Sequence, residues 1–250
     1  MPWSIVWEKV AESTNDLACA LALGGGIDTP FVVRANQQTK GRGRGANVWW
    51  SDEGSLTFTL VIDPTAHGLK LIHEPRLALA TAVAVIGALG KIFTAMTPLG
   101  IRWPNDIEAA GKKLGGILTE RVETPSGVRL LIGVGINVHT DLAGAPAGVR
   151  KLAVAIRDSR DFLKSENERD TLFGIILEEC TAVFPRLAGD DPRLARRWAD
   201  LDTLNDEAVQ VDLGTRIVTG IGRGIDAEGA LVLASEKGEE RLIGGRVLRD

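Results

Sequence analysis

The stretch from Gln38 to Ser51, QTKGRGRGANVWWS, combines residue types that suit an anionic ligand with an apolar part. Glycines alternate with basic residues over residues 40–45, and Trp49 and Trp50 follow. Glycine allows the backbone to approach a ligand closely, its amides can hold phosphate, and arginine binds carboxylate or phosphate oxygens in a fork. The same composition is typical of a solvated arginine–glycine loop or an RNA-contacting segment. The P-loop ending and the Rossmann glycine spacing are both absent.

A second cluster, RWPNDI followed by GKKLGGIL, places an amide, a carboxylate and an amine on one predicted hairpin. Pro104 fixes a rigid exit from a strand, and Asn105 and Asp106 follow it. Lys113 lies on the returning strand, so its amine can approach Asp106, and the glycines after it permit close approach of a ligand. The alternative is a surface hairpin with solvated lysines and an Asn-Asp turn. We prefer that alternative for Lys112 and a functional role for Lys113.

Two further segments carry polar groups that a ligand could use. Gly133 and Gly135 lie on one face of a predicted strand, with Asn137 after them on that face. Glycines weaken a strand, so something should occupy the space they leave, either a ligand or a packed helix. A buried Asn137 needs hydrogen-bond partners. The STND segment (13–16) predicts a helix cap, whose free amides also suit a polar ligand.

A scaffold of strands and helices must position these residues. Ser13 or Thr14 begins a helix that Gly24–Gly26 end. The apolar helix at 75–95 is predicted to be buried, and the strand at 129–138 is apolar on nearly every residue, as if buried on both faces. Further strands are expected at 30–36, 55–62, 99–103, 107–109 and 114–122, and further helices at 169–187 and 192–203.

Beyond Leu204 the pattern changes to short strands separated by turns. These strands are EAVQVDL, RIVTGIGRGI, ALVLAS and RLIGGRVL, with turns at 226–229 and 236–240. Their spacing predicts a small β barrel of roughly 45 residues, too short to be very stable alone. We therefore expect two domains, 1–204 and 205–250.

The composition narrows the class of protein. The chain has 250 residues, 44% of them hydrophobic and 25% charged, with a net charge of −4, as in an ordinary soluble domain. This acidic balance argues against a protein that coats nucleic acid. The two cysteines, Cys19 and Cys180, form no disulfide framework and fit a reducing cytosol. The N-terminus has no secretory signal, the apolar run at 76–93 is short for a membrane span, and the three histidines show no metal spacing.

Taken together and in this order, the motifs resemble those of the biotin protein ligases (biotin–acetyl-CoA-carboxylase ligases). That family has a Ser-Thr-Asn helix start, a Gln-x-x-Gly-Arg-Gly-Arg loop ending in Trp, a Trp-Pro-Asn-Asp hairpin with Lys-Leu-x-Gly-Ile-Leu, and Gly-x-Gly-Ile-Asn-Val. The matching residues are Ser13-Thr14-Asn15, Gln38, Gly41-Arg42-Gly43-Arg44, Trp49, Trp103–Asp106, Lys113–Leu118 and Gly133–Val138. The match covers about residues 10–140, and the combination is specific although each motif alone is not.

The resemblance implies an α+β fold. A class II synthetase-like catalytic domain, with a mixed sheet and helices, would precede a small SH3-like β barrel. The implied activity converts biotin and ATP to biotinyl-5′-AMP and pyrophosphate, then transfers biotin to one lysine of a biotin carboxyl carrier protein domain. ATP and Mg²⁺ are implied, with unknown magnesium ligands. We expect a cytoplasmic monomer or homodimer that binds neither specific DNA nor membrane.

The resemblance also assigns roles to residues. Arg42, Arg44, Lys113 and Asp106 are the catalytic candidates: the arginines fold over the carboxylate and phosphate, Lys113 contacts both, and Asp106 orients or deprotonates the incoming lysine. Ser13, Thr14, Asn15 and Gln38 bind or border the ureido end of biotin. The residues expected to contact biotin or the adenylate are Ser13, Thr14, Asn15, Gln38, Gly41, Arg42, Gly43, Arg44, Trp49, Asn105, Lys113, Gly116, Gly135 and Asn137.

Two departures and two alternatives accompany the resemblance. Many members continue the loop with further basic residues, where this chain has Gly45, Ala46 and Asn47, so contacts made by those arginines are absent or replaced. The Ser-Thr-Asn start at residue 13 leaves no room for the N-terminal winged helix of some relatives, and we expect no repressor role. A lipoate–protein ligase or octanoyltransferase is the nearest alternative function. A non-catalytic RNA-binding module is the second.

Overall fold

The computed structural model describes residues 3–93, 98–156, 166–236 and 238–248. The strands are β1 (Ser4–Ala11), β2 (Phe31–Gln38), β3 (Ser55–Ile62), β4 (Leu99–Arg102), β5 (Asp106–Ala109), β6 (Lys112–Thr124), β7 (Gly127–Asn137), β8 (Ala208–Asp212), β9 (Ile217–Ile225), β10 (Leu231–Ser235), β11 (Gly238–Leu242) and β12 (Arg246–Val247). The helices are α1 (Thr14–Gly24), α2 (Leu77–Ile92), α3 (Ala147–Leu152), α4 (Glu166–Ala188) and α5 (Pro192–Asp200), with short 3-10 turns at Thr65–His67, Leu71–Arg76 and Leu142–Gly144.

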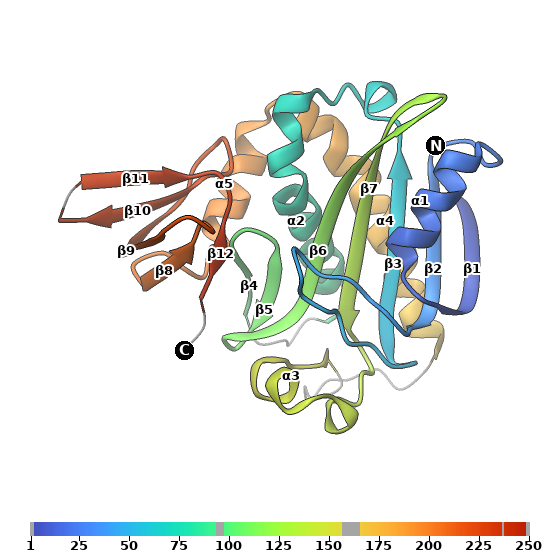
Figure 1. Cartoon of the computed structure of the whole chain (residues 1–250), viewed down its shortest axis with the longest axis horizontal. Coiled ribbons are helices and arrows are strands. Elements are labelled where there is room, and N and C mark those ends of the chain that lie inside the picture. The colour runs from blue at the N-terminus through green and yellow to red at the C-terminus, as the bar shows by residue number, and fades with distance from the viewer. Residues whose placement is uncertain (1–2, 94–97, 157–165, 237, 249–250) are drawn as a thin grey trace.

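Two sheets organise the chain (Figure 1). The first has seven strands in the order β1-β2-β3-β7-β6-β5-β4, and the second has five in the order β11-β10-β9-β8-β12. Strands β1 and β2 are parallel, and all other neighbours in both sheets are antiparallel. The first sheet is therefore mixed, and a small all-β unit follows it, as the sequence predicts.

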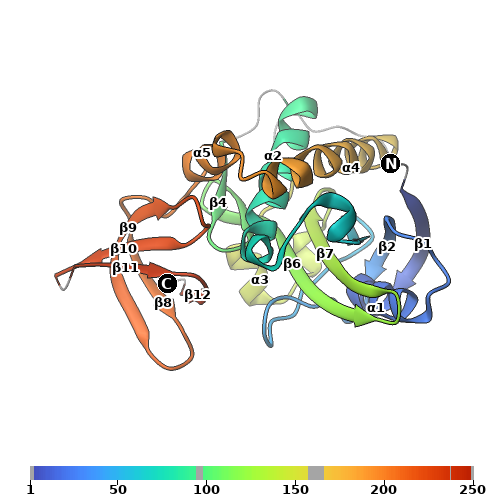
Figure 2. The same ribbon diagram turned by 90° about the horizontal axis from the view of Figure 1, so that it is seen from above.

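The main core lies between the first sheet and the helices α2 and α4, while α1 covers the opposite face (Figure 2). Every position of β3 is buried, as expected for a central strand rich in β-branched and aromatic residues. Helix α2 is buried along most of its length, which confirms the predicted core helix. The stretch Leu71–Ile92 is long and apolar enough to cross a membrane, but 61% of its most apolar window is buried inside the protein.

Two buried tryptophans fix the second sheet to the part of the chain that carries the first sheet. Trp103 Nε1 donates a hydrogen bond to the carbonyl of Gly229 at 3.0 Å, and Trp198 Nε1 donates one to the carbonyl of Asp226 at 3.0 Å. Both side chains are at most 2% exposed. Because the turn at 226–229 supplies both acceptors, these bonds fix the position of the small sheet beside α5 and β4.

The structure differs from the sequence prediction at both ends of the chain. Strand β1 was not predicted, because almost all of its residues are exposed and no apolar alternation marks it. The predicted single strand at 241–248 is interrupted: β11 begins at Gly238, inside the predicted turn, and β12 forms only after Gly245. Gly245 has a φ of 141°, a conformation that favours glycine and breaks the strand there.

Candidate active site

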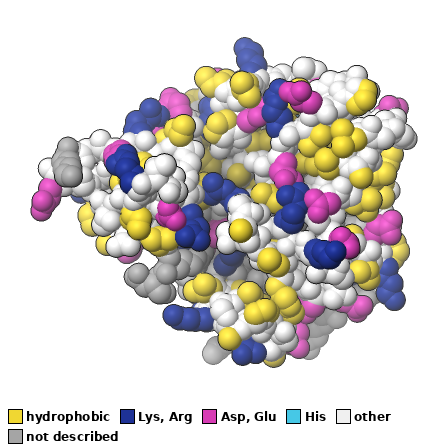
Figure 3. All heavy atoms as spheres, viewed as in Figure 1, with side chains coloured by type: hydrophobic (Ala, Val, Ile, Leu, Met, Phe, Trp, Pro, Cys, Tyr) yellow, Lys and Arg dark blue, Asp and Glu magenta, His cyan; other side chains and the backbone are white. Residues whose placement is uncertain are grey.

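A cavity of about 880 Å³ lies on the α1 face of the first sheet, between the 38–51 loop, the β5–β6 hairpin and the C-terminal strand β12. Figure 3 shows the hollow between the lobe of the second sheet and the main body, with Lys and Arg side chains along its walls. The predicted site residues that line the cavity are Ser13, Thr14, Asn15, Gln38, Arg42, Gly43, Arg44, Trp49, Asn105, Asp106, Lys113, Gly116 and Gly135. Gly41 and Asn137 lie outside its lining.

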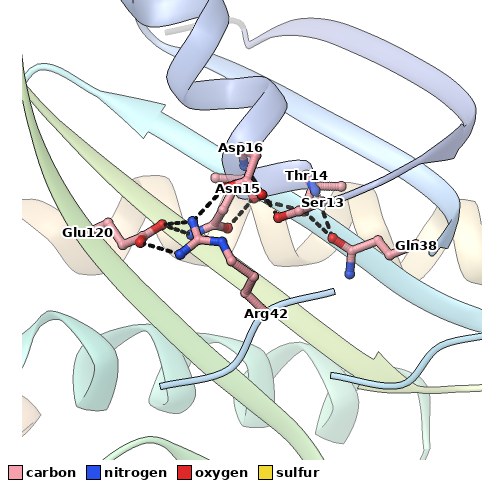
Figure 4. A network of polar contacts seen from close by, with 8 residues as sticks. Ser13, Thr14, Asn15, Asp16, Gln38, Arg42 and Glu120 are labelled. Carbon is pink, nitrogen blue, oxygen red and sulfur yellow. Dashed lines mark hydrogen bonds and ion pairs between the residues drawn. The ribbon is translucent and has the colours of Figure 1, made fainter. Parts of the chain in front are cut away.

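At the start of α1 the cavity is lined mainly by neutral polar side chains (Figure 4). We call it the uncharged end, because the Arg42 guanidinium beside them is paired with the carboxylates of Glu120 and Asp16. Ser13 is the helix N-cap, and Gln38 Oε1 accepts hydrogen bonds from Thr14 N at 2.7 Å and Thr14 Oγ1 at 3.1 Å. The buried Thr59 hydroxyl contacts Thr14 Oγ1 at 2.9 Å and Asn15 Oδ1 at 2.6 Å. Sequence reasoning missed Thr59, because one threonine in a core strand carries no motif. These bonds hold the polar side chains in place.

The glycines of β7 leave space for protein side chains. A Cβ atom on Gly133 would lie 2.2 Å from Asn15 Oδ1, and one on Gly135 would lie 2.6 Å from the Trp49 ring. A Cβ on Gly41 would lie 2.5 Å from the Trp49 carbonyl. Trp49 Nε1 is buried and has no hydrogen-bond partner within the described residues. The predicted need for space is therefore met by two cavity-lining side chains seated against the strand.

The β5–β6 hairpin brings Lys113 and Asp106 together, with Nζ 2.6 Å from Oδ1. The register of the two strands shifts by one residue, because Leu114 is an extra residue in β6. Such a bulge re-aims the neighbouring side chains, so Lys113 lies over Gly116, where a Cβ would be 3.3 Å from Nζ. The ammonium is also 5.8 Å from the centroid of the Trp49 ring, within cation–π range.

Two of the predicted asparagines, Asn105 and Asn137, bind backbone groups. Asn105 Nδ2 donates to the carbonyl of Ile117 at 2.7 Å and so fixes the hairpin entry. Asn137 Nδ2 donates to the carbonyls of Val154 at 3.1 Å and Lys113 at 3.5 Å. The protein thus supplies the partners that a buried Asn137 needs. Its geometric effect on the cavity is exerted through the Lys113 backbone, and a direct contact with ligand stays a prediction.

Arg44 connects the loop to the second sheet. Its Nη1 donates to the carbonyl of Gly245 at 3.0 Å. Burial lowers the pKa of the Arg44 guanidinium, and the charge of Asp106 opposes that change. Gly245 directly precedes β12 of the second sheet, so both sheets contribute to the cavity wall.

Two cavity-lining cations were missed by sequence reasoning. Arg102 donates to the carbonyl of Leu248 at 3.2 Å, and Arg246 pairs with Asp212 at 3.0 Å. Arg102 directly precedes the Trp-Pro motif, and Arg246 directly follows two glycines. The sequence shows both arginines next to a motif, but only the fold shows that both side chains line the same cavity.

Arg42 has a different environment from the other cations. Its guanidinium binds both carboxylate oxygens of Glu120, at 2.8 and 2.7 Å, and also lies 2.8 Å from Asp16 Oδ1 (Figure 4). The hydrogen bonds to Glu120 raise the pKa of Arg42. Glu120 was not a predicted site residue, because it lies beside Arg121 in the second half of β6, where a single carboxylate carries no motif.

The cavity therefore has an uncharged hydrogen-bonding end and a cationic end, with an aromatic ring between them. This arrangement suits a ligand that has a neutral polar head, an apolar middle and an anionic tail. No cluster of three His, Cys, Asp or Glu side chains that could hold a metal ion occurs in the described ranges.

Comparisons with known proteins agree with this chemistry. The biotin/lipoate A/B protein ligase family matches residues 7–137, and the biotin protein ligase C terminal domain matches residues 206–249. A biotin–[acetyl-CoA-carboxylase] ligase of Paracoccus denitrificans is 31% identical, over 92% of this chain and 93% of that protein. The bifunctional ligase/repressor BirA of Bacillus spizizenii is 29% identical, over 95% of this chain and 71% of that protein.

A solved structure shares the fold. The biotin protein ligase from Aquifex aeolicus, in complex with biotin and ATP, has a TM-score of 0.80 and 23% identity, and the alignment covers 98% of this chain and 97% of that one. The fold class predicted from the sequence, a ligase-type mixed sheet followed by a small β domain, is thereby confirmed. On the strength of these matches, the chain belongs to the biotin/lipoate A/B protein ligase family.

Proposed function

We propose that the chain is an ATP-dependent biotin–protein ligase. It activates biotin to biotinyl-5′-AMP with release of pyrophosphate, and then transfers biotin to a lysine of a biotin carboxyl carrier protein domain of a carboxylase such as acetyl-CoA carboxylase. The observation that carries the proposal is the two-ended cavity with Lys113 and Asp106 paired at 2.6 Å on its cationic side. We assign catalysis to a domain of residues 1–204 and a supporting role to a domain of residues 205–250.

We assign the uncharged end to the ureido head of biotin. A ureido group is neutral and carries both donors and acceptors, and so do Ser13, Thr14, Asn15 and Gln38. A site built to hydrogen-bond such a group rejects an analogue that lacks it, since buried polar groups would be left unpaired. The Trp49 ring, seated on Gly135, supplies the apolar surface for the valeryl chain.

We assign the cationic end to the reacting carboxylate and phosphates. Attack of a carboxylate on the α-phosphate brings two anions together, so cations placed where charge develops accelerate it. Lys113 and Arg44 take this role, and Arg102 and Arg246 extend positive charge toward the remaining phosphates. Mg²⁺ enters with ATP as its complex and is held chiefly by the phosphates, as magnesium often is.

We assign Asp106 to the second step. Once Lys113 turns to the phosphate, the Asp106 carboxylate can orient the carrier lysine and accept its proton, because a general base must reach that proton directly. Arg42 was predicted to fold over the ligand, but in the structure it is bound to Glu120 and Asp16. Its direct contact with ligand stays a prediction.

The named relatives favour biotin over lipoate, and the net charge of −4 disfavours an RNA-binding module. The test is incubation with biotin, ATP and Mg²⁺, followed by mass spectrometry for biotinyl-adenylate and for a modified lysine on a carrier domain. Labelling of a lipoyl domain from lipoate and ATP, with biotin ignored, would overturn the proposal. Cytoplasmic location, a monomeric or homodimeric state and the lack of specific DNA binding are part of the proposal, and chromatography on operator-type DNA tests the last.

A further inference from the structure

The carboxylate of Glu120, on β6, joins three separate elements without lining the cavity. Its two oxygens accept hydrogen bonds from the Arg42 guanidinium of the loop, at 2.8 and 2.7 Å. Oε2 also accepts one from Asn15 Nδ2, in the first turn of α1, at 2.7 Å. Arg42 and Asn15 do line the cavity, so Glu120 contacts two lining residues without being one itself (Figure 4).

The Glu120 contacts are of the strong kind. A bidentate arginine–carboxylate pair fixes geometry as well as energy. The side chain of Glu120 is 29% exposed and that of Arg42 is 39% exposed, so water screens the attraction between their charges, and the paired hydrogen bonds fix the geometry. Burial alone would raise the pKa of Glu120, but the hydrogen bonds from Arg42 and Asn15 outweigh it and hold the pKa below its ordinary value.

Glu120 also settles the orientation of the Asn15 amide. Asn15 Nδ2 donates to Glu120, and Asn15 Oδ1 accepts from Thr59 Oγ1 at 2.6 Å. With both atoms committed, the amide has one orientation toward the cavity. A single carboxylate therefore couples the uncharged end of the cavity to the position of the loop.

We propose that Glu120 is a positioning residue: it latches the 38–51 loop over the cavity through Arg42 and fixes the Asn15 amide for the ligand head. Arg42 then acts mainly as the loop's anchor on the first sheet, while Arg44 serves the ligand. Loss of the latch leaves Lys113 paired with Asp106 and Arg44 bonded to the Gly245 carbonyl, but it frees the part of the loop around Arg42. The retention of ligand and intermediate, rather than the rate of the chemical step, depends on Glu120. The retention part rests on the proposed function.

The latch itself can be tested on the ligand-free chain. Lys40, Arg42 and Arg44 are trypsin sites within the loop, and a latched loop resists cleavage. Glu120→Gln places an amide donor against donors and should speed cleavage there about tenfold. The matched control is Glu74→Gln, since Glu74 pairs at 2.6 Å with Arg121, the next residue of β6. Equal cleavage rates in wild type, Glu120→Gln and Glu74→Gln would overturn the latch.

The functional part is tested by the lifetime of bound biotinyl-adenylate. After formation from biotin and ATP, a chase with unlabelled biotin should show release about tenfold faster, and a higher KM for biotin, in Glu120→Gln than in Glu74→Gln. The rate constant of pyrophosphate release in a single turnover and the thermal unfolding temperature should stay near wild type. Unchanged release with an accelerated loop cleavage would overturn the positioning role and leave the latch.

A second variant tests the same contact in case Glu120→Gln fails to fold. Arg42→Lys keeps the charge and the trypsin site but cannot bind both oxygens at once. It should give the same faster cleavage and faster release, to a smaller extent, and wild-type behaviour in both assays would overturn the proposal. If no adenylate forms even in wild type, the proposed function fails, while the cleavage assay still decides the latch.

Discussion

Arg42 and Arg44 are separated by one glycine, yet they lie at opposite ends of the cavity. Arg42 is bound by the carboxylates of Glu120 and Asp16, which raise its pKa, whereas Arg44 is desolvated and donates to one backbone carbonyl, which leaves its pKa lowered. Two identical side chains in one loop therefore have different tasks. Carboxylates of the protein balance the charge of Arg42, whereas Arg44 is bonded to a neutral carbonyl and can bind an anionic ligand.

The same contrast extends to the rest of each end. At the uncharged end, Thr14, Asn15 and Gln38 are bonded to one another or to Thr59 and Glu120, so this end is organised before ligand arrives. At the cationic end the partners are single carboxylates, Asp106 for Lys113 and Asp212 for Arg246. An incoming phosphate can exchange with these carboxylates, so this end should respond to the charge of the ligand and the other to its shape.

Replacement of Lys113 should give the largest effect. Lys113→Ala removes the cation paired with Asp106, and loss of one group that stabilises developing charge costs about 100-fold to 1,000-fold in rate. Single-turnover pyrophosphate release measures it. Lys112→Ala is the control, because that neighbouring side chain is exposed. Turnover of Lys113→Ala near the wild-type rate would make Lys113 a surface residue and remove the basis of the cationic end.

The two arginines should separate in the next assay. Arg44→Ala should slow adenylate formation about 10-fold to 100-fold, while Arg42→Ala should slow it only a few-fold and act mainly on release of the intermediate. Both rates come from rapid-quench and chase experiments. Arg223→Ala, which breaks an exposed pair with Asp206 in the second sheet, is the control. Equal profiles for Arg42→Ala and Arg44→Ala would erase the distinction between the two ends.

Asp106→Asn should separate the two steps of the reaction. The amide keeps the shape of the side chain but cannot accept a proton, so biotin transfer to the carrier should fall about tenfold to 100-fold while adenylate still forms. Adenylate and labelled carrier are quantified in the same reaction by mass spectrometry. Loss of adenylate formation alone would assign Asp106 to the first step and merge its role with that of Lys113.

The sequence predicted the elements whose pattern is local. β3 was predicted at its observed bounds, and the cap at Ser13 and the glycine stop of α1 follow from side-chain chemistry at those positions. β1 could not be predicted, since an exposed edge strand has no apolar period. Its existence depends on pairing with β2, which is a tertiary effect.

Site residues that belong to a local motif could be predicted from the sequence. Residues that reach the site only through a contact with a distant part of the chain could not. Lys113 and Asp106 were expected to meet because a hairpin brings its two strands together. Glu120 and Arg246 were not expected, because each is a single charged residue whose meaning comes from a partner more than 30 residues away, Arg42 for Glu120 and Asp212 for Arg246. The bulge at Leu114, which turns Lys113 toward the cavity, likewise has no signature in the sequence.

A smaller effect is expected from Gln38. Its carbonyl oxygen accepts two hydrogen bonds from Thr14, so Gln38→Ala loosens the uncharged end. The KM for biotin should rise about tenfold, with the KM for ATP unchanged, because a lost hydrogen-bond network costs about 1–2 kcal/mol. Steady-state kinetics with each substrate varied measure it, with Gln210→Ala, at an exposed position of β8, as the control. A rise in the KM for ATP alone would place the nucleotide at this end.

Asp202, whose carboxyl feels the charge of Arg102 but does not line the cavity, should give the smallest effect, seen in stability rather than in rate. Burial raises the pKa of its carboxyl to about 6, against the opposing Leu204 N–H and Arg102 charge. The folded protein therefore binds this proton more tightly than the unfolded chain, whose aspartates have pKa values of about 3.9. Ionisation of Asp202 costs stability as the pH rises from about 4 to 6, and the cost persists above pH 6.

Asp202→Asn removes that ionisation. The free energy of unfolding of the variant minus that of wild type should be higher at pH 8 than at pH 4, by about 2 kcal/mol after allowance for partial exposure, because the variant is relatively more stable at pH 8. Urea unfolding at both pH values measures the difference, and any fixed cost of the amide cancels between them. Asp200→Asn, at the exposed end of α5, should show no such change. If the difference in unfolding free energy between the variant and wild type is the same at both pH values, Asp202 ionises without a cost to stability. The positive charge of Arg102 would then be balanced by Asp202 and would not act on a ligand in the cavity.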